Sequence, residues 1–150
     1  MKVSHLGGRP MDVKEIMTKT LVTASVNDTV GHALRLLEDQ EIRHLPIVNG
    51  TKLVGMVSDR DLREYRLPLL VELNEPKRAD AMLQTPLFEL MKEAVLALET
   101  HETLVQAIDL LLQYGVGAAP VVERDSDDLV GIVSYVDVLR ALRPIAAADE

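Results

Sequence analysis

The sequence predicts an α/β (α+β) fold in which two β-α-β-β-α repeats pack on each other as a pseudo-twofold pair. The first observation is a duplicated block: residues 53–62 return as residues 129–138, 76 positions later, with six of the first nine positions identical. The second is that matches continue upstream at an offset of 74, so that the two-residue difference falls in a turn, where changes of length cost little. The third is a helix pattern at the same place in both copies. The upstream matches are Glu15/Glu89, Met17/Met91, Thr29/Thr103, Ala33/Ala107, Leu36/Leu110, Leu37/Leu111, Pro46/Pro120 and Val48/Val122.

Each repeat is predicted to open with a helical turn, at residues 13–17 and 87–91, and to continue with a short extended segment around residues 21–23 and 95–97. A helix then starts at residues 27–29, because short polar side chains accept hydrogen bonds from the free N–H groups of a first turn. In both copies this helix has apolar residues at i, i+3, i+4 and i+7, which indicates one buried face. These residues are Val30, Ala33, Leu34, Leu37 and Leu104, Ala107, Ile108, Leu111.

Two strands follow the helix in each copy. Asn49-Gly50 separates the first pair and predicts a hairpin, because both residues tolerate a positive φ. Pro46 and Pro120 stand among the first residues of their strands, where a missing N–H costs least. The strands are predicted at residues 45–48 and 53–57, and at 119–122 and 129–133 with a longer acidic turn.

Closing helices are predicted to start at Ser58 and at Ser134, and the second is expected to end before Pro144. Between the copies, residues 66–85 form a longer connection that is expected to dock through its apolar residues.

Composition limits the class of protein. At 150 residues and 47% hydrophobic content the chain can bury a core, and with three Tyr, one Phe and no Trp this core is aliphatic. The lack of cysteine excludes disulfides, thiol catalysis and thiolate metal sites. No apolar run approaches the length of a membrane helix and the first residues do not form a signal peptide, so we expect a cytoplasmic protein.

The net charge of −8 is concentrated in the second half, where six Lys and Arg face thirteen Asp and Glu in residues 76–150. Such a surface repels phosphodiester backbones, which disfavours nucleic-acid binding. A small anionic ligand held by a few local cations remains compatible with this charge.

The opening Ile-Met-Thr at 16–18, the segment Ile-Arg-His-Leu-Pro-Ile-Val at 42–48 and the Gly-x-Val-Ser-x-x-Asp blocks at 55–61 and 131–137 resemble the CBS domain, named for cystathionine β-synthase. Tandem CBS domains form a ligand-sensing unit, the Bateman module. The resemblance implies one CBS repeat at residues 10–66, a linker at 67–85 and a second repeat at 86–143.

The Ser58-x-x-Asp61 and Ser134-x-x-Asp137 motifs have two interpretations. From the local pattern, each is a helix capping box. The resemblance adds a second role, because the matching residues of the family contact ribose and a carboxylate can accept from two vicinal hydroxyls. Asp61 and Asp137 would then be the ribose acceptors of two pockets, assisted by Ser58 and Ser134. One residue pair can fill both roles.

Arg43 and His44 precede the proline strand of the first repeat. The resemblance implies that they meet nucleotide phosphates, because guanidinium and protonated imidazole groups bind phosphate oxygens well; the alternative is a pair of solvated residues at a junction. Arg60, and less specifically Arg63, can support the same anion. The second repeat has Gly117-Ala118 in place of Arg43-His44, which predicts one charged pocket and one without phosphate cations of its own.

The remaining ligand-binding candidates that the resemblance implies are residues that would wall an adenine, although they fit ordinary strand positions equally well. They are Thr20, Val22, Ala94 and Leu96, and the two strand prolines, Pro46 and Pro120, are further candidates for ligand contact.

No catalytic or metal motif is recognisable: the four histidines form no paired metal spacing, and neither a Gly-rich phosphate loop nor a Gly-x-Ser-x-Gly elbow is present. The resemblance implies a non-enzymatic regulatory protein that binds AMP, ADP, ATP, S-adenosylmethionine or a dinucleotide messenger in a cleft between the repeats. It also implies a homodimer that signals to a separate, unidentified effector protein, with no obligatory cofactor, metal, nucleic acid or membrane partner. The alternatives are an interaction scaffold with empty pockets, a hydrolase using Ser58, Asp61 and His44, and a nucleic-acid regulator, which the charge disfavours.

Overall fold

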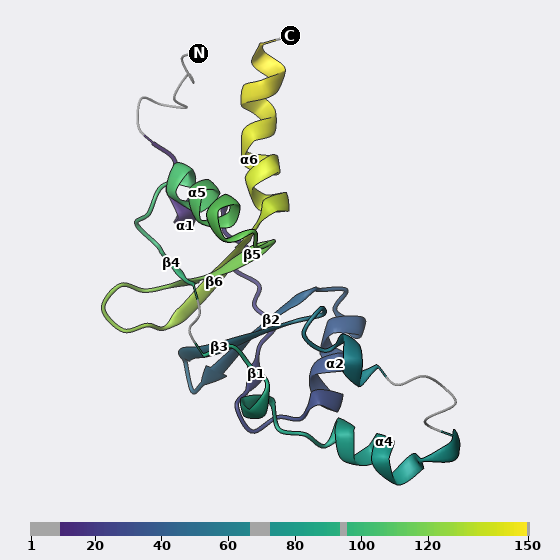
Figure 1. Cartoon of the computed structure of the whole chain (residues 1–150). Helices are drawn as coiled ribbons and strands as arrows, with labels where there is room; N and C mark the ends of the chain where they lie inside the picture. The colour runs from purple at the N-terminus through teal and green to yellow at the C-terminus, as the bar shows by residue number, and fades with distance from the viewer. Residues whose placement is uncertain (1–9, 67–72, 94–95, 150) are drawn as a thin grey trace. The chain divides into compact units, whose positions relative to one another are not determined.

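The computed structural model describes residues 10–66, 73–93 and 96–149. The chain divides into two compact units whose boundaries do not follow the sequence repeats. We call residues 22–95 the first-repeat unit, and residues 1–21 together with 96–150 the second-repeat unit, after the repeat that supplies each sheet. Figure 1 shows the elements of both units in chain order.

The first-repeat unit contains a three-stranded sheet in the order β1-β2-β3. The β1 and β2 strands are parallel, and β2 and β3 form an antiparallel hairpin. The α2 helix begins where Thr29 Oγ1 accepts a hydrogen bond from the His32 N–H at 3.2 Å, as the polar start of this helix predicted. The elements are β1 (Ala24–Ser25), α2 (Val30–Asp39), β2 (His44–Asn49), β3 (Lys52–Ser58), the 3₁₀ turn η2 (Arg63–Tyr65), α4 (Pro76–Leu83) and the 3₁₀ turn η3 (Leu87–Glu89).

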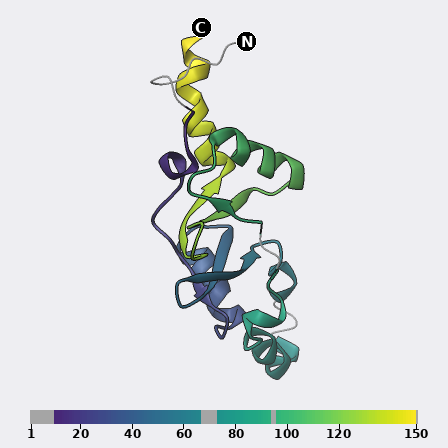
Figure 2. The ribbon, with the colours of Figure 1, turned by 90° about the vertical axis from the view of Figure 1, so that its left-hand side faces the viewer.

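The second-repeat unit repeats this topology with the sheet order β4-β5-β6. Its main helix, α5, begins with a capping box between Thr103 and Gln106. The α6 helix continues from the end of β6 and packs beside α5, as Figures 1 and 2 show. The elements are α1 (Val13–Ile16), β4 (Leu98–Glu99), α5 (Leu104–Tyr114), β5 (Ala118–Val122), β6 (Leu129–Ser134) and α6 (Tyr135–Ala148). The predicted α/β class is thus confirmed.

Each repeat contributes its opening segment to the unit built on the sheet of the other repeat. Val13, in the opening turn of the first repeat, is fully buried in the core of the second-repeat unit. Its N–H donates to the carbonyl of Glu102 at 2.7 Å. In the same way, Leu87 from the opening of the second repeat is fully buried in the core of the first-repeat unit. Its N–H donates to the Asp28 carbonyl at 2.8 Å.

The first strand of each unit lies about three residues later than the sequence predicted, at β1 and β4 rather than around residues 21–23 and 95–97. Pairing of β1 with β2 begins at Ile47, and pairing of β4 with β5 begins at Val121. Both residues directly follow the prolines that lack an N–H, so the parallel ladder starts only beyond each proline. The hairpin at Asn49-Gly50 is confirmed, but of these two residues only Gly50 has a positive φ, of 65°.

The closing helices differ from the prediction in both repeats. After Ser58 the chain forms turns and the short η2 segment, with 3₁₀-type bonds such as Tyr65 N–H to the Leu62 carbonyl at 3.0 Å. A following proline, Pro68 in the sequence, disfavours a longer helix here. In the second repeat α6 runs through Pro144 instead of ending before it. Pro144 is exposed, so water can satisfy the carbonyl that loses its partner, and the alanines that follow favour the helix.

The connection between the repeats contains a helix that sequence reasoning did not predict, α4, with Pro76 in its first turn. Ala79 is buried and α4 packs against α2, where the Leu83 carbonyl limits the space at Gly31. The apolar residues 67, 69, 70 and 71 lie outside the described residues, and Leu73 is 69% exposed. The described part of the connection therefore docks through α4.

Candidate functional site

The two Ser-x-x-Asp motifs lie at equivalent places, where the last strand of each sheet ends. Ser58 is the last residue of β3 and pairs with His44, the first residue of β2. Ser134 ends β6 and pairs with Ala118, the first residue of β5. The hairpin thus holds the motif of each unit beside the residues that precede its proline.

Both motifs form the capping box that the local pattern predicted. In the first-repeat unit, Ser58 N–H donates to Asp61 Oδ2 at 2.9 Å, and Asp61 N–H donates to Ser58 Oγ at 3.2 Å. In the second-repeat unit, Ser134 N–H donates to Asp137 Oδ2 at 2.9 Å, and Asp137 N–H donates to Ser134 Oγ at 3.3 Å. One carboxylate oxygen, Oδ2, therefore serves the backbone in each unit.

The other carboxylate oxygen, Oδ1, is contacted by the opening segment that each unit receives from the other repeat. Thr18 Oγ1 donates to Asp137 Oδ1 at 3.0 Å. Lys92 Nζ lies 3.7 Å from Asp61 Oδ1. Thr18 and Lys92 hold matching positions, directly after Met17 and Met91. The same type of acceptor is thus held by a neutral hydroxyl in one unit and by an ammonium group in the other.

In the second-repeat unit an arginine also lies near the carboxylate of the motif. Arg140 Nη1 lies 3.6 Å from Asp137 Oδ1, one helical turn after that residue on α6. Its side chain is 75% exposed, whereas that of Asp137 is only 7% exposed. The second repeat therefore does have one cation near its carboxylate, although Gly117 and Ala118 supply none.

At the Asp61 site, the surroundings of His44 change the pKa of its imidazole. Burial lowers the pKa of the His44 imidazole below its ordinary value of 6.5, Asp61 opposes this change and Arg43 adds to it. His44 is therefore mostly neutral near pH 7. An anion bound beside it would favour the protonated form, which can donate from both ring nitrogens.

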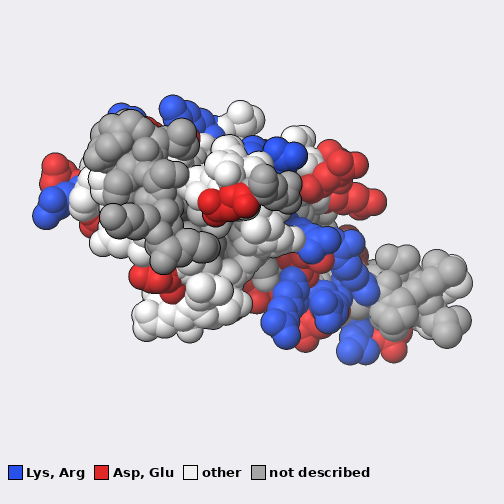
Figure 3. Space-filling model, turned by 90° about the horizontal axis from the view of Figure 1, so that it is seen from above, with Lys and Arg blue, Asp and Glu red and all other residues white. Residues whose placement is uncertain are grey.

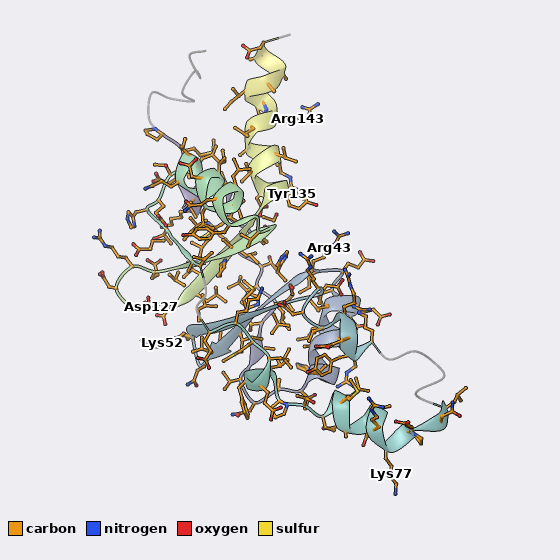
Figure 4. The ribbon with its side chains drawn as sticks, in the orientation of Figure 1. Arg43, Lys52, Lys77, Asp127, Tyr135 and Arg143 are labelled. Atoms are coloured by element: carbon orange, nitrogen blue, oxygen red, sulfur yellow. The ribbon has the colours of Figure 1, made fainter. Side chains whose placement is uncertain are left out.

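The basic residues predicted around this site are exposed on the first-repeat unit. Arg43 points outward at the end of β2 opposite the hairpin that carries Lys52 (Figure 4). Arg60 and Arg63 are also exposed, whereas Arg66 binds Asp59 at 2.7 Å. Figure 3 shows several Lys and Arg side chains close together on the surface, with Asp and Glu side chains among them. The arrangement leaves Arg43 and Arg60 accessible to an anion.

The remaining predicted residues are divided between the two units. Thr20 and Leu96 belong to the second-repeat unit and are exposed, whereas Val22 packs against the core of the first-repeat unit. Ala94 lies outside the described residues. Pro46 and Pro120 are fully buried in their sheets, so in this structure they offer no surface to a ligand.

Neither a membrane-spanning helix nor a metal site is found in the described part of the chain. None of its helices is long and apolar enough to cross a membrane. Among the same residues, no group of three His, Asp or Glu side chains is placed to hold a metal ion. An open hollow along α6 is lined by Val136, Leu139, Arg140, Leu142, Arg143 and Ala146.

Sequence reasoning missed three residues that contact the two carboxylates: Thr18, Lys92 and Arg140. A signal for the first two was present, because the offset of 74 residues aligns them directly after the matched methionines. Arg140 follows Asp137 by three residues, the spacing at which helix side chains meet. The contacts of Thr18 and Lys92 depend on the exchanged opening segments, which the repeat pattern does not reveal.

Comparison with known proteins gives a consistent result. The sequence model of the CBS domain matches residues 13–68 and 87–144. An uncharacterised 33.4 kDa protein of Thermofilum pendens is 37% identical over 139 residues, which cover 91% of this chain and 45% of that protein. This chain spans about half the length of the first curated relatives that it matches.

Two solved structures share both fold and sequence with this chain. CBSX2 from Arabidopsis thaliana, in complex with AMP, is 30% identical with a TM-score of 0.73, covering 91% of this chain and 98% of that one. The CBS domain pair of protein MJ0100, in complex with 5′-methylthioadenosine and S-adenosyl-L-methionine, is 27% identical with a TM-score of 0.71 over the same shares.

Proposed function

Because this chain belongs to the CBS domain family, we propose that it is a regulatory CBS pair, without catalytic activity of its own, that binds an adenosyl ligand at Asp61 and Asp137. The proposal rests on one observation: the two oxygens of each carboxylate have different partners. Oδ2 is used by the capping box, while Oδ1 is contacted only through side chains. Oδ1 is thus the atom that can accept from ribose hydroxyls without loss of the backbone contact.

The ligand class follows from the relatives and from the charges of the site. AMP in CBSX2, and 5′-methylthioadenosine and S-adenosylmethionine in MJ0100, share an adenosyl group and differ in the substituent at the 5′ position. We propose the same class here, with AMP, ADP and ATP as candidates for the Asp61 site, because Arg43 and Arg60 supply cationic donors there and a bound anion would favour protonation of His44. Asp61 accepts from Ser58 N–H and not from the Ser58 hydroxyl, which itself accepts from Asp61 N–H, so the capping box supports a binding role for this motif over a nucleophilic one.

A regulatory role requires that ligand binding be passed on, and the exposed apolar residues of α5 and α6 suggest how. Val105 is 63% exposed and Leu112 76% on α5, and Leu139 is 60% exposed on α6. Large exposed apolar residues grouped on neighbouring helices are typical of an interface. We propose a homodimer through these helices that signals to a separate effector protein; the effector would respond to a ligand-dependent difference between two states.

Binding is tested on the purified chain by mass spectrometry of co-purifying small molecules and by thermal unfolding with AMP, ADP, ATP, S-adenosylmethionine and 5′-methylthioadenosine. A ligand that binds only the folded state raises Tm with concentration. GMP serves as the control for the adenine group. If none of the adenosyl compounds raises Tm or shifts the protein's NMR spectrum, the binding proposal is wrong. The exposed helix faces would then favour the alternative, an interaction scaffold with empty pockets.

A further inference from the structure

Lys92 and Thr18 differ in chemistry but share one backbone environment. Thr18 exchanges two backbone hydrogen bonds with Ile132, at 2.8 and 3.0 Å, in the second-repeat unit. Lys92 exchanges two with Met56, at 3.2 and 3.3 Å, in the first-repeat unit. Both side chains therefore leave the backbone at equivalent points beside the candidate ribose acceptor of their unit. The difference between the two sites at this point is the side chain alone.

The contact that Lys92 makes is easily exchanged. Its side chain is 73% exposed, and its ammonium group stands 3.7 Å from Asp61 Oδ1, beyond the distance of a strong charge-assisted hydrogen bond. Ion pairs that water reaches contribute little to stability, and the lysine side chain has a flexible four-carbon stem. The ammonium group can therefore turn from Asp61 to another anion at small cost.

From these contacts we propose that Lys92 makes the Asp61 site select adenosyl ligands that carry a phosphate, a role that rests on the function proposed above. A nucleoside must draw Oδ1 of Asp61 away from Lys92 and offers the ammonium group no anion in exchange. A nucleotide offers a phosphate, so that Asp61 turns to the ribose hydroxyls while Lys92 turns to the phosphate. Lys92 thereby adds a movable cation to the charges of Arg43 and Arg60.

The second-repeat unit provides the matched comparison. There Thr18 donates a neutral hydrogen bond to Asp137 at 3.0 Å, which positions the carboxylate for any ribose and provides no charge. Arg140 is that unit's cation near Oδ1, but it extends from α6 and lines the hollow on that helix. Removing the Lys92 charge should thus change the preference between nucleotide and nucleoside at one site only.

The test follows each site by the methyl group of its own methionine in NMR titrations of the ¹³C-methyl-methionine-labelled chain. Met91 packs against Gly55 in the unit of Asp61, and Met17 packs against Gly131 in the unit of Asp137. AMP and adenosine are titrated into the wild type, Lys92→Gln and Lys92→Arg. At the site that Met91 reports, Lys92→Gln should lower the affinity for AMP five- to tenfold, about 1–1.4 kcal/mol, and should leave the affinity for adenosine unchanged or raise it. Lys92→Arg should keep the preference for AMP, and the Met17 site should not respond to either variant.

The outcomes separate this inference from the function on which it rests. Suppose that the Met91 signal shifts with AMP, but that Lys92→Gln lowers the affinities for AMP and adenosine equally or changes neither. Lys92 then has no part in selectivity, while the proposal of adenosyl binding stands. If neither methyl group shifts with AMP, adenosine or S-adenosylmethionine, both proposals fail. A second measurement needs no variant: salt between about 0.05 and 0.5 M should weaken AMP more at the Met91 site than at the Met17 site, and equal effects would overturn the inference.

Discussion

The side chain of Met17 fills the space that a side chain of Gly131 would need: a Cβ added to Gly131 would stand 2.5 Å from the Met17 sulfur atom. Met91 has the same relation to Gly55, again at 2.5 Å. Each methionine comes from the opening segment of one repeat and each glycine from the sheet of the other. The glycine of the repeated Gly-x-Val-Ser block therefore admits the exchanged opening segment.

Gly131→Ala should destabilise the protein by about 1–3 kcal/mol, because it overfills a packed contact. Rotation of the methionine would relieve only part of the contact, since Met17 Cβ would still lie 3.2 Å from the added Cβ. The free energy of unfolding in urea measures the effect. In a double-mutant cycle, the variant that combines Gly131→Ala with Met17→Ala should lose less unfolding free energy than the sum of the two single variants.

The mismatched pair, Gly131→Ala with Met91→Ala, is the control for that cycle and should be additive, because the three atoms nearest to a Cβ at Gly131 all belong to Met17. Equal coupling in matched and mismatched pairs would contradict the one-to-one contact between methionine and glycine.

Asp137→Ala and Ser134→Ala should separate capping from ligand binding. Both remove part of the capping box and should cost about 0.5–2 kcal/mol in unfolding free energy. Only Asp137→Ala also removes Oδ1, so it alone should lose about 1.5–3 kcal/mol of adenosyl binding at its site. Calorimetric titration and urea unfolding give the two quantities. Unchanged affinity in both Asp137→Ala and Asp61→Ala would show that these carboxylates are caps only.

Arg43→Ala should reduce the affinity of the Asp61 site for AMP and leave adenosine almost unaffected, because the exposed guanidinium can bind only the phosphate. A loss on the order of 1–3 kcal/mol is expected for a charge-assisted contact. Arg35→Ala, an exposed arginine on α2 of the same unit, is the matched control. Equal binding of AMP and adenosine by the intact protein would remove the phosphate role of Arg43 and His44.

His44 should make stability depend on pH in one direction. Because burial lowers the pKa of His44 in the folded protein, the unfolded chain takes up the proton first as the pH falls below about 6.5. The stabilisation from neutral His44 is thus complete above that pH and is lost as the pH falls toward the folded pKa. In urea unfolding from pH 7.5 to 5.0, His44→Gln should lose less stability than the wild type. If the unfolding free energies of the wild type and His44→Gln depend on pH in the same way, the lowered pKa of His44 is wrong.

Leu139→Glu should shift the oligomeric state toward the monomer, because it places a charge among the exposed apolar side chains of α6. Size-exclusion chromatography with light scattering measures the mass directly. Leu73→Glu changes a similarly exposed leucine of the other unit and should leave the mass as in the wild type. A monomeric wild type would refute the proposed dimer.

Sequence reasoning predicted the parts of the fold that depend on local signals. The stripe from Val30 to Leu37 predicted α2, and Asn49-Gly50 predicted the hairpin, because periodicity and turn chemistry act within a few residues. It placed the end of α6 too early, because Pro144 lies on the exposed side of the helix, where a proline is tolerated. It also expected a helix after Ser58, where the capping box is present but the chain continues in 3₁₀-type turns.

For the site, the Ser-x-x-Asp pattern contained enough information to predict both capping boxes. It did not contain the partner of the second carboxylate oxygen. Thr18 lies 119 residues from Asp137, and no local rule connects residues so distant in the chain. Arg140 is different: it follows Asp137 by three residues in a helix that the sequence predicted, so a local rule could have placed it near the carboxylate that Gly117 and Ala118 leave without a basic neighbour.

The sequence by itself determined that this protein consists of two copies of one unit, each with an amphipathic helix, a proline-started hairpin and a capped Ser-x-x-Asp motif. Only the tertiary structure decided that the opening segment of each copy packs on the sheet of the other. As a result, Thr18 contacts Asp137 and Lys92 contacts Asp61. The physical reason is that helix stripes, turns and caps are specified by neighbours in the chain, whereas these contacts depend on the packing of Met17 and Met91 into the space that Gly131 and Gly55 leave open.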